Sequence, residues 1–249
     1  MYETKADTTG GAVAEALHDE ALRMGRVLKA DVPSLDELVG GFRSAQVTLF
    51  DSDSDYASEL LHLLCVRAVA GFDEEAVWID GGNAIEPYKL SSICRRLGLD
   101  RRDILSRINV SRAFTAYQFM SLVEDRLEDE VAERTPAMIV VSSATDLFMD
   151  KDMKWMESYQ LLRRCADVIS RVTQEHETMT LVTANTPGRT APDPRMVALL
   201  SERSDEVVQM RSRREGVLFR LPKRGRSMVF SPKPWNQSTI DEFGGDVHG

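Results

Sequence analysis

The sequence predicts an α/β fold in which a mostly parallel β-sheet is flanked by helices. Short apolar segments, most of them ending in a polar residue, alternate with longer segments of helical periodicity. This alternation is typical of βαβ units, whose right-handed crossovers place helices on both faces of a parallel sheet. The chain has 249 residues, 43% of them hydrophobic and 29% charged, so it can bury a sizeable core.

The elements follow in a regular order along the chain. Parallel strands are expected at 46–50, 76–80, 106–110, 137–141 and 179–183. Helices are expected at 12–28, within 32–42, and at 55–70, 87–97, 115–134 and 153–176. After Ser204, short strands joined by turns rich in arginine and glycine are expected at 205–211, 215–221 and 226–230. These three strands predict an antiparallel, β-rich C-terminal extension of the sheet.

The chain divides into three expected parts: an N-terminal polar segment with an amphipathic helix (1–29), a core domain (30–232) and a polar tail (233–249). The net charge of -9 argues against a generally basic surface for nucleic acid. The three cysteines lie far apart without a CxxC pattern, which indicates free thiols and no zinc site. Neither a signal peptide core nor a membrane-spanning apolar run is apparent, so we expect a cytoplasmic protein without a membrane partner.

Four segments carry a resemblance to a known superfamily. They are LDELVGGF (35–42), VWIDGGNAIEPYKL (77–90), INVSRAFTAYQF (108–119) and MIVVSSATDLF (138–148). In this order they resemble the core ATPase domain of the RecA/RadA recombinase superfamily, in particular its archaeal RadA-type members. The resemblance implies a RecA-like fold of the P-loop NTPase type over residues 30–232, and it hints at an archaeal source.

Within this resemblance, residues 51–58 (DSDSDYAS) occupy the place of the Walker A phosphate loop, whose pattern is GxxxxGKT. Asp51 and Tyr56 stand where the two glycines belong, and Ala57 stands where the lysine belongs. Ser58 keeps the hydroxyl that binds magnesium in the family. The loop is therefore degenerate, since the glycines let backbone N–H groups wrap the phosphates and the lysine neutralises their charge.

Three further positions of the resemblance have also lost their family residue. The Walker B aspartate falls at Ser142, the catalytic glutamate at Gly82, and the γ-phosphate sensor glutamine at Asn185. The metal ligand, the base and the phosphate clamp contribute separately to phosphoryl transfer. Their joint loss predicts a pseudo-ATPase without a bound cofactor.

The acidic turn itself argues against a phosphate ligand. Asp51, Asp53 and Asp55 would lie against a triphosphate, and each like-charge pair at ~4 Å costs on the order of 4 kcal/mol at an effective dielectric constant of ~20. We expect Asp53, Ser54 and Asp55 to cap the following helix instead and so to close the phosphate site. An EF-hand calcium loop is the alternative, but Tyr56 and His62 replace its required glycine and glutamate, so no metal site is predicted.

A basic region offers another kind of site. Residues 203–233 carry nine Lys or Arg side chains against three acids, which suits a phosphate backbone or an acidic partner. The loop 185–195 adds Arg189 and Arg195 where recombinases have a DNA-contacting loop. The candidate contacts are Arg189, Arg195, Arg211, Arg213, Arg214, Lys223, Arg224 and Arg226. A solvated turn region without a ligand is the alternative.

The resemblance and the lost residues together predict a non-catalytic paralog of RadA-type recombinases. Such a protein would bind a RecA-family recombinase or ATPase in DNA recombination and repair, with single-stranded DNA and a homo-oligomer as further expected partners. A nucleic-acid-binding accessory protein is one alternative. A KaiC-like regulator, or an atypical ATPase completed by a partner subunit, is another.

Overall fold

The structure, a computed structural model, describes residues 25–186 and 191–230. Its main sheet has the strand order β10-β9-β8-β3-β7-β6-β4-β5. The parallel strands are β3 (Gln46–Ser52), β4 (Ala76–Asp80), β5 (Ile108–Arg112), β6 (Met138–Ser142), β7 (Met179–Thr183) and β8 (Glu206–Arg213). The antiparallel strands are β9 (Gly216–Leu221) and β10 (Arg226–Phe230). A separate two-stranded sheet joins β1 (Val27–Leu28) to β2 (Phe42–Arg43).

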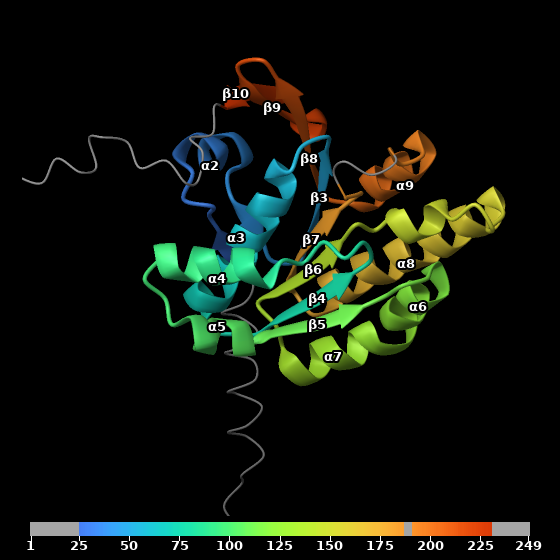
Figure 1. Cartoon of the computed structure of the whole chain (residues 1–249), viewed down its shortest axis with the longest axis horizontal. Helices are drawn as coiled ribbons and strands as arrows, with labels where there is room; N and C mark the ends of the chain where they lie inside the picture. The colour runs from blue at the N-terminus through green and yellow to red at the C-terminus, as the bar shows by residue number, and fades with distance from the viewer. Residues whose placement is uncertain (1–24, 187–190, 231–249) are drawn as a thin grey trace, which may run out of the picture.

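Helices cover both faces of the main sheet (Figure 1). One face carries α2 (Pro33–Val39), α3 (Tyr56–Phe72), α4 (Pro87–Arg96) and α5 (Arg101–Ser106). The other carries α6 (Ala116–Ser121), the π-helical segment η1 (Leu122–Arg126), α7 (Leu127–Arg134), α8 (Trp155–Glu175) and α9 (Pro194–Arg203). The short 3-10 turns are η2 (Asp146–Met149) and η3 (Pro222–Arg224).

The core lies in two layers, one on each face of the sheet, because side chains alternate along each strand. On β3, Leu49 points into the layer beneath α8 and α9, while Phe50 points into the layer beneath α3. The middle strands are buried on both faces, as the short apolar segments indicated. The expected α/β, RecA-like fold class with a β-rich C-terminal part is thus confirmed.

Several boundaries differ from the sequence prediction. The strand expected at 106–110 begins at Ile108, because Arg101–Ser106 forms a helix that Asp100 caps through the N–H groups of Arg102 and Asp103. The helix expected at 115–134 is interrupted by η1. Val27 and Leu28, expected in a helix, form β1 instead, and the rest of that predicted helix (12–24) lies outside the described residues. The division into 1–29, 30–232 and 233–249 stays a prediction.

The extension at the C-terminal side of the sheet combines both strand directions. β8 runs parallel to β3, so the antiparallel pairings of this extension are those of β8 with β9 and of β9 with β10. As a result, β3 lies in the middle of the sheet between β7 and β8. The carboxyl ends of β3, β4, β6 and β7 meet at one edge, where open α/β sheets place their ligand sites.

Candidate functional site

The acidic turn lies at this edge, between the end of β3 and the start of α3 at Tyr56. Two of its three carboxylates bond to β8. The Asp51 carboxylate accepts hydrogen bonds from Arg211 Nη2 at 2.6 Å and from Gln209 Nε2 at 3.1 Å. Asp53 Oδ1 accepts a hydrogen bond from the backbone N–H of Ser212 at 2.8 Å. The turn therefore joins β3 to the C-terminal strands.

The expectation that this turn caps α3 is wrong. Asp55 occupies the N-cap position in a helical conformation, with φ -63°, and its side chain makes no capping hydrogen bond. The Asp53 carboxylate is directed to β8, and the N–H of Ser54 donates to Ser52 Oγ at 3.1 Å. The Asp51 and Asp53 carboxylates thus serve the contact between β3 and β8, and the Asp55 carboxylate lies at the start of the helix without capping it.

Tyr56 belongs to the core. Its ring packs edge-on against Phe219 of β9, with centroids 5.5 Å apart, and against Phe230 of β10. Burial raises the pKa of the Tyr56 hydroxyl. The residue at the second glycine position of the resemblance is therefore an anchor for the C-terminal hairpin, which explains why a large side chain stands there.

The neighbouring positions line a hollow above the sheet edge. Ala57, at the lysine position of the resemblance, is buried. Ser58 Oγ accepts a hydrogen bond from the ammonium of Lys89 at 3.3 Å, and Lys89 also pairs with Glu86 at 2.6 Å. Lys89 comes from α4, so one ammonium does lie beside Ser58, although it belongs to another element. Lys89 was not among the predicted site residues, because nothing in its local sequence pattern indicates that α4 lies next to α3.

The hollow has a volume of about 390 Å³. Besides Ala57 and Ser58 it is lined by Asn83, Ser143, Asn185 and Thr186, among others. Three carboxylates line it against the single ammonium of Lys89; they belong to Asp55, Glu59 and Glu86. The acidic turn was expected to close this site, and this expectation is wrong, because the hollow stays open. The excess of negative charge around the hollow nevertheless disfavours a phosphate.

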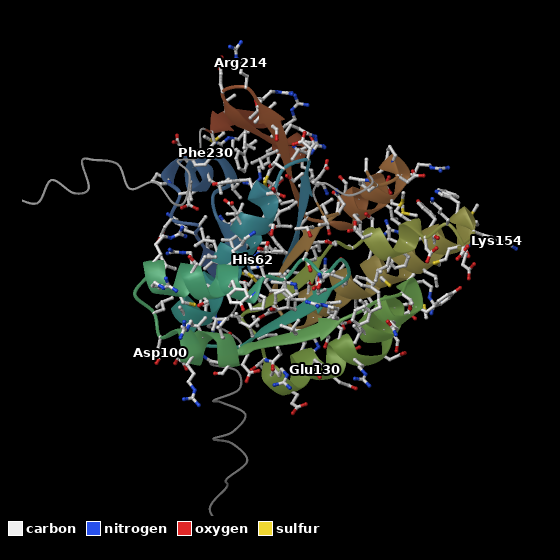
Figure 2. All side chains as sticks on the ribbon, in the orientation of Figure 1. His62, Asp100, Glu130, Lys154, Arg214 and Phe230 are labelled. Carbon is white, nitrogen blue, oxygen red and sulfur yellow. The ribbon has the colours of Figure 1, made fainter. Side chains whose placement is uncertain are left out.

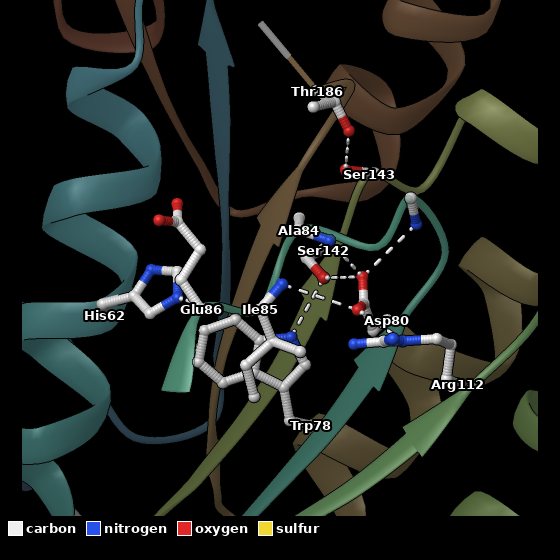
Figure 3. Close-up of polar contacts among 11 residues, drawn as sticks. His62, Trp78, Asp80, Ala84, Ile85, Glu86, Arg112, Ser142, Ser143 and Thr186 are labelled. Atoms are coloured by element: carbon white, nitrogen blue, oxygen red, sulfur yellow. Dashed lines mark hydrogen bonds and ion pairs between the residues drawn. The ribbon is translucent and has the colours of Figure 1, made fainter. Parts of the chain in front are cut away.

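Asp80, at the end of β4, organises the loop beside this hollow (Figure 3). Its carboxylate is completely buried. It accepts hydrogen bonds from Ser142 Oγ at 3.0 Å and from the backbone N–H groups of Ala84 at 2.9 Å, Gly82 at 3.3 Å and Ile85 at 3.4 Å. It also pairs with Arg112 Nε at 3.1 Å.

Ser142, the Walker B position of the resemblance, is part of the same network. Its hydroxyl accepts a hydrogen bond from Trp78 Nε1 at 2.9 Å and donates to Asp80. Both residues end buried strands of the sheet, β6 and β4. Asp80 was not among the predicted site residues, although an acidic residue at the end of an apolar strand is a signal for such a site.

Gly82, the position of the catalytic glutamate in the resemblance, is packed without room for a side chain. A Cβ atom built on Gly82 would lie 2.6 Å from Ser143 Oγ and 2.6 Å from Thr186 Oγ1. These two hydroxyls are hydrogen-bonded to each other at 2.7 Å. Asn185, next to this pair, donates to the Thr186 carbonyl at 3.4 Å. The pair therefore fills the space that a side chain at position 82 would need.

His62 lies inside the molecule beside the hollow, and Figure 2 shows its place on α3. Nδ1 lies 2.6 Å from the Ser58 carbonyl, and Nε2 accepts the N–H of Glu86 at 2.9 Å. The two contacts together assign the proton of a neutral ring to Nδ1. Burial lowers the pKa of His62 from 6.5 to about 4.

We expect this histidine to make stability fall in mild acid. Between pH 6.5 and 4 the unfolded chain binds a proton that the folded protein does not, so stability falls as pH falls through that window. From pH 7 to pH 5 the loss is about 2 kcal/mol. Urea unfolding at both pH values measures it. His62→Gln does not titrate, so equal pH dependence in variant and parent would contradict the assignment.

The structure divides the basic candidates into two groups. Five have partners within the chain, and four of these pairs are Arg211 with Asp51, Lys223 with the Ser204 carbonyl, Arg224 with Glu206, and Arg226 with the Glu37 carbonyl. Arg195 pairs with Asp193 at 2.7 Å, with its guanidinium 3.7 Å above the Trp155 ring. Arg213 and Arg214 are exposed, and Arg214 lies at the tip of the β8–β9 hairpin (Figure 2). Arg189 lies outside the described residues.

Within residues 25–186 and 191–230, no helix is both long and apolar enough to cross a membrane. In the same ranges, no three side chains of His, Cys, Asp or Glu come together so as to hold a metal ion.

The fold and the hollow define a class of protein. A mainly parallel sheet with helices on both faces, antiparallel C-terminal strands and a polar hollow at the carboxyl strand ends is characteristic of RecA-like α/β proteins. A family model described as Rad51 matches residues 27–192, which is more than half of the chain. The chain therefore belongs to the Rad51 family.

Two relatives show how far the similarity reaches. The chain is 31% identical over 120 residues to the meiotic recombination protein DLH1 of Candida albicans, covering 45% of this chain and 37% of that protein. It is 30% identical over 161 residues to the DNA repair protein RAD51 of Saccharomyces cerevisiae, covering 55% of this chain and 40% of that protein. The matches thus span about two fifths of these relatives' length.

Proposed function

We propose that this chain is a non-catalytic member of the Rad51 family that acts in DNA recombination and repair by binding a RecA-family ATPase. The names of its relatives, a meiotic recombination protein and a DNA repair protein, support the pathway. The packing at Gly82 is the observation that supports the non-catalytic part of the proposal. The space for a catalytic glutamate is occupied by the hydrogen-bonded pair Ser143 and Thr186.

The rest of the hollow supports the same proposal. ATP carries several negative charges on its phosphates, and the hollow presents three carboxylates and one ammonium. The acidic turn has its Asp51 and Asp53 carboxylates bonded to β8 and its Tyr56 ring in the core. A flexible, glycine-rich loop that wraps a phosphate would have neither constraint.

An exposed apolar region supports partner binding. Among the strands of the described residues, β5 is the edge strand of the sheet and pairs with β4 alone, and Val110 on it is 47% exposed. Phe114 follows this strand and is 73% exposed. Tyr117 of α6 is half exposed and donates a hydrogen bond to Glu157 at 2.6 Å, next to the exposed Met156. Large apolar side chains gathered on neighbouring elements are typical of interaction surfaces.

Calorimetry with Mg-ATP is the direct test of the nucleotide part. We expect no binding at millimolar nucleotide and no phosphate release above the buffer rate, because the phosphate clamp and the base are both lost. An active RecA-family ATPase measured in parallel is the control. Saturable binding at millimolar ATP or below, or steady phosphate release by the chain alone, would overturn the non-catalytic assignment.

The partner part is tested by co-purification with the RecA-family recombinase of the same organism. We expect a complex on size exclusion that Phe114→Ser with Tyr117→Ser weakens, while thermal unfolding of the variant is unchanged because both side chains are exposed. Tyr88→Ser, another exposed aromatic on α4, is the matched control. An equal loss of complex in both variants would argue against partner binding at the β5 side of the sheet.

One observation favours a second candidate, an ATPase completed by a partner subunit. The hollow stays open, and Lys89 lies beside Ser58, which keeps the hydroxyl of the Walker A pattern. In that case ATP hydrolysis would appear only in the mixture with the partner. It would be lost with Lys89→Ala in this chain, whereas a pure binding platform would leave the partner's own hydrolysis insensitive to Lys89→Ala.

A further inference from the structure

The corner between α4 and α5 holds a hollow of about 310 Å³ that is lined mainly by arginines. Its lining residues, which we call the arginine corner, are Arg95, Leu99, Asp100, Arg101 and Arg102. The arginine corner lies far from the β8–β9 hairpin, as the labels of Asp100 and Arg214 in Figure 2 show. None of its residues lines the hollow beside Ser58.

A Schellman motif ends α4 at this corner. The N–H of Gly98 donates to the Arg95 carbonyl at 3.2 Å, and the N–H of Leu99 donates to the Cys94 carbonyl at 2.9 Å. Gly98 has the positive φ, 67°, that the motif requires. Leu99 is partly buried against the core layer beneath α3, so it fixes the turn and also forms the apolar part of the hollow.

The helix that follows this turn begins with two arginines. Asp100 occupies the N-cap of α5, and Arg101 and Arg102 come next, beside Arg95 in the last turn of α4. A cation in the first turn of a helix is repelled by the partial positive charge of the helix N-terminus. The stability of α5 therefore does not account for these two arginines, which indicates another role.

The three arginines carry uncompensated charge. Arg95, Arg101 and Arg102 are exposed, and within residues 25–186 and 191–230 their side chains have no hydrogen bond or ion pair. Asp100, next to them, caps α5 through two backbone N–H groups. Guanidinium groups around one hollow repel each other, and an anion that enters the hollow would relieve this repulsion.

We propose that the arginine corner binds an acidic segment of a partner protein, in which a large apolar side chain lies next to carboxylates. The planar guanidinium fork matches a carboxylate with two parallel hydrogen bonds. Clusters of arginines are a recurring means of recognising acidic motifs. Leu99 gives the apolar side chain of the segment a contact in the same hollow.

Two observations favour a short acidic peptide over a long phosphate chain. Asp103 directly follows the arginines and pairs with Arg107, and Asp73, which also pairs with Arg107, has a side chain that is 91% exposed. These carboxylates would repel a phosphate backbone that continued beyond the hollow. A phosphate backbone would also leave Leu99 without an apolar contact.

The arginine corner is separate from the surface at the β5 side, so this inference goes beyond the function proposed above. The exposed apolar side chains there lie on and between β5, α6 and α8, whereas the arginine corner belongs to α4 and α5. Loss of binding at one of the two surfaces should therefore leave binding at the other intact.

The test is fluorescence anisotropy with the full chain at about 100 mM salt, where exposed charges more than ~10 Å apart are largely screened. The probe is a labelled peptide of about 12 residues that repeats two acids and one leucine. We expect it to bind with a Kd of about 100 μM or tighter, and Arg95→Gln with Arg101→Gln and Arg102→Gln should weaken binding about tenfold or more.

The matched control removes the same charge at three exposed arginines of the hairpin, by Arg213→Gln with Arg214→Gln and Arg220→Gln. Its affinity for the peptide should stay within about twofold of the parent, because distant charges are screened. No binding of the peptide by the parent, or equal losses in both triple variants, would overturn the proposal.

Thermal unfolding separates binding from stability. The triple variant of the arginine corner should unfold at no lower temperature than the control, because Arg101 and Arg102 oppose the helix dipole. A lower unfolding temperature than that of the control would assign the arginines to stability and overturn the proposal.

Changes in the probe identify the ligand. Serine in place of each leucine should weaken binding about threefold or more at unchanged charge, because the apolar contact is lost. Equal affinity for the serine peptide would contradict the proposed apolar contact and overturn the proposal. Single-stranded DNA of equal charge that bound more tightly, and lost this binding in the triple variant of the corner, would also overturn it.

Discussion

Replacing Asp80 by alanine is expected to lower the free energy of unfolding by about 4 kcal/mol. Removing one partner of a buried ion pair costs about 3–5 kcal/mol, and here the loss also leaves loop N–H groups without an acceptor. Asp80 is completely buried, pairs with Arg112 and accepts from Ser142 and the backbone of the following loop. Urea unfolding followed by circular dichroism measures the change.

Two variants separate the Asp80 network from a general effect of losing a carboxylate. Asp80→Asn keeps the shape of the side chain but places an amide group against the same donors. Its free energy of unfolding should therefore fall by about half as much as that of Asp80→Ala. Glu128→Ala removes a half-exposed carboxylate that pairs with Arg171 at 2.8 Å, and such surface pairs contribute little. If Asp80→Ala were as stable as Glu128→Ala, the organising role of Asp80 would be wrong.

A side chain at position 82 is the second change with a large expected effect. Gly82→Ala should destabilise the protein by about 3 kcal/mol, because the new Cβ would approach Ser143 Oγ and Thr186 Oγ1 to 2.6 Å. Gly82→Glu, which would restore the glutamate of the resemblance, should cost more and bring no ATP hydrolysis. Thermal and urea unfolding measure both variants.

The cause of this effect can be isolated with Ser143 and Gly71. Ser143 has a positive φ of 57°, which glycine adopts without strain. Ser143→Gly removes the clashing hydroxyl, so it should recover much of the stability lost in Gly82→Ala. Gly71 lies in α3 with open space around it, and Gly71→Ala should stabilise by up to about 1 kcal/mol. Equal effects of alanine at positions 71 and 82 would refute the packing argument.

Much of the fold could be predicted because the buried strands carry a strong local signal. β4 and β7 begin and end as expected, since each is a short apolar run bounded by polar residues. The helix α9 was not predicted, although Asp193 at the N-cap and Pro194 in the first turn were signals for it. The loop expected at 185–195 covers only the first two residues of this helix, and no element was expected for the rest of it.

The candidate site was less predictable, because its contacts join distant parts of the chain. The acidic turn suggested a local cap, since Asp and Ser near a helix start usually serve one. The competing partners are Arg211 and the N–H of Ser212 on β8. Only the parallel pairing of β8 with β3 brings them to the turn. The places of Lys89 and Thr186 could not be predicted for the same reason, because their hydrogen-bond partners Ser58 and Ser143 lie on other elements.

The central place of β3 has a consequence for how the protein is made. Gln46 pairs with Met179, and Thr48 with Glu206, so both strand partners of β3 leave the ribosome long after it does. At ordinary synthesis rates the wait is on the order of ten seconds. During this time β4, β5 and β6, which pair with one another, can form a sheet without β3, and one edge of β6 waits for β7. The apolar segment from β3 through α3 must meanwhile stay free of other chains, which makes it the part of the nascent protein most in need of a chaperone.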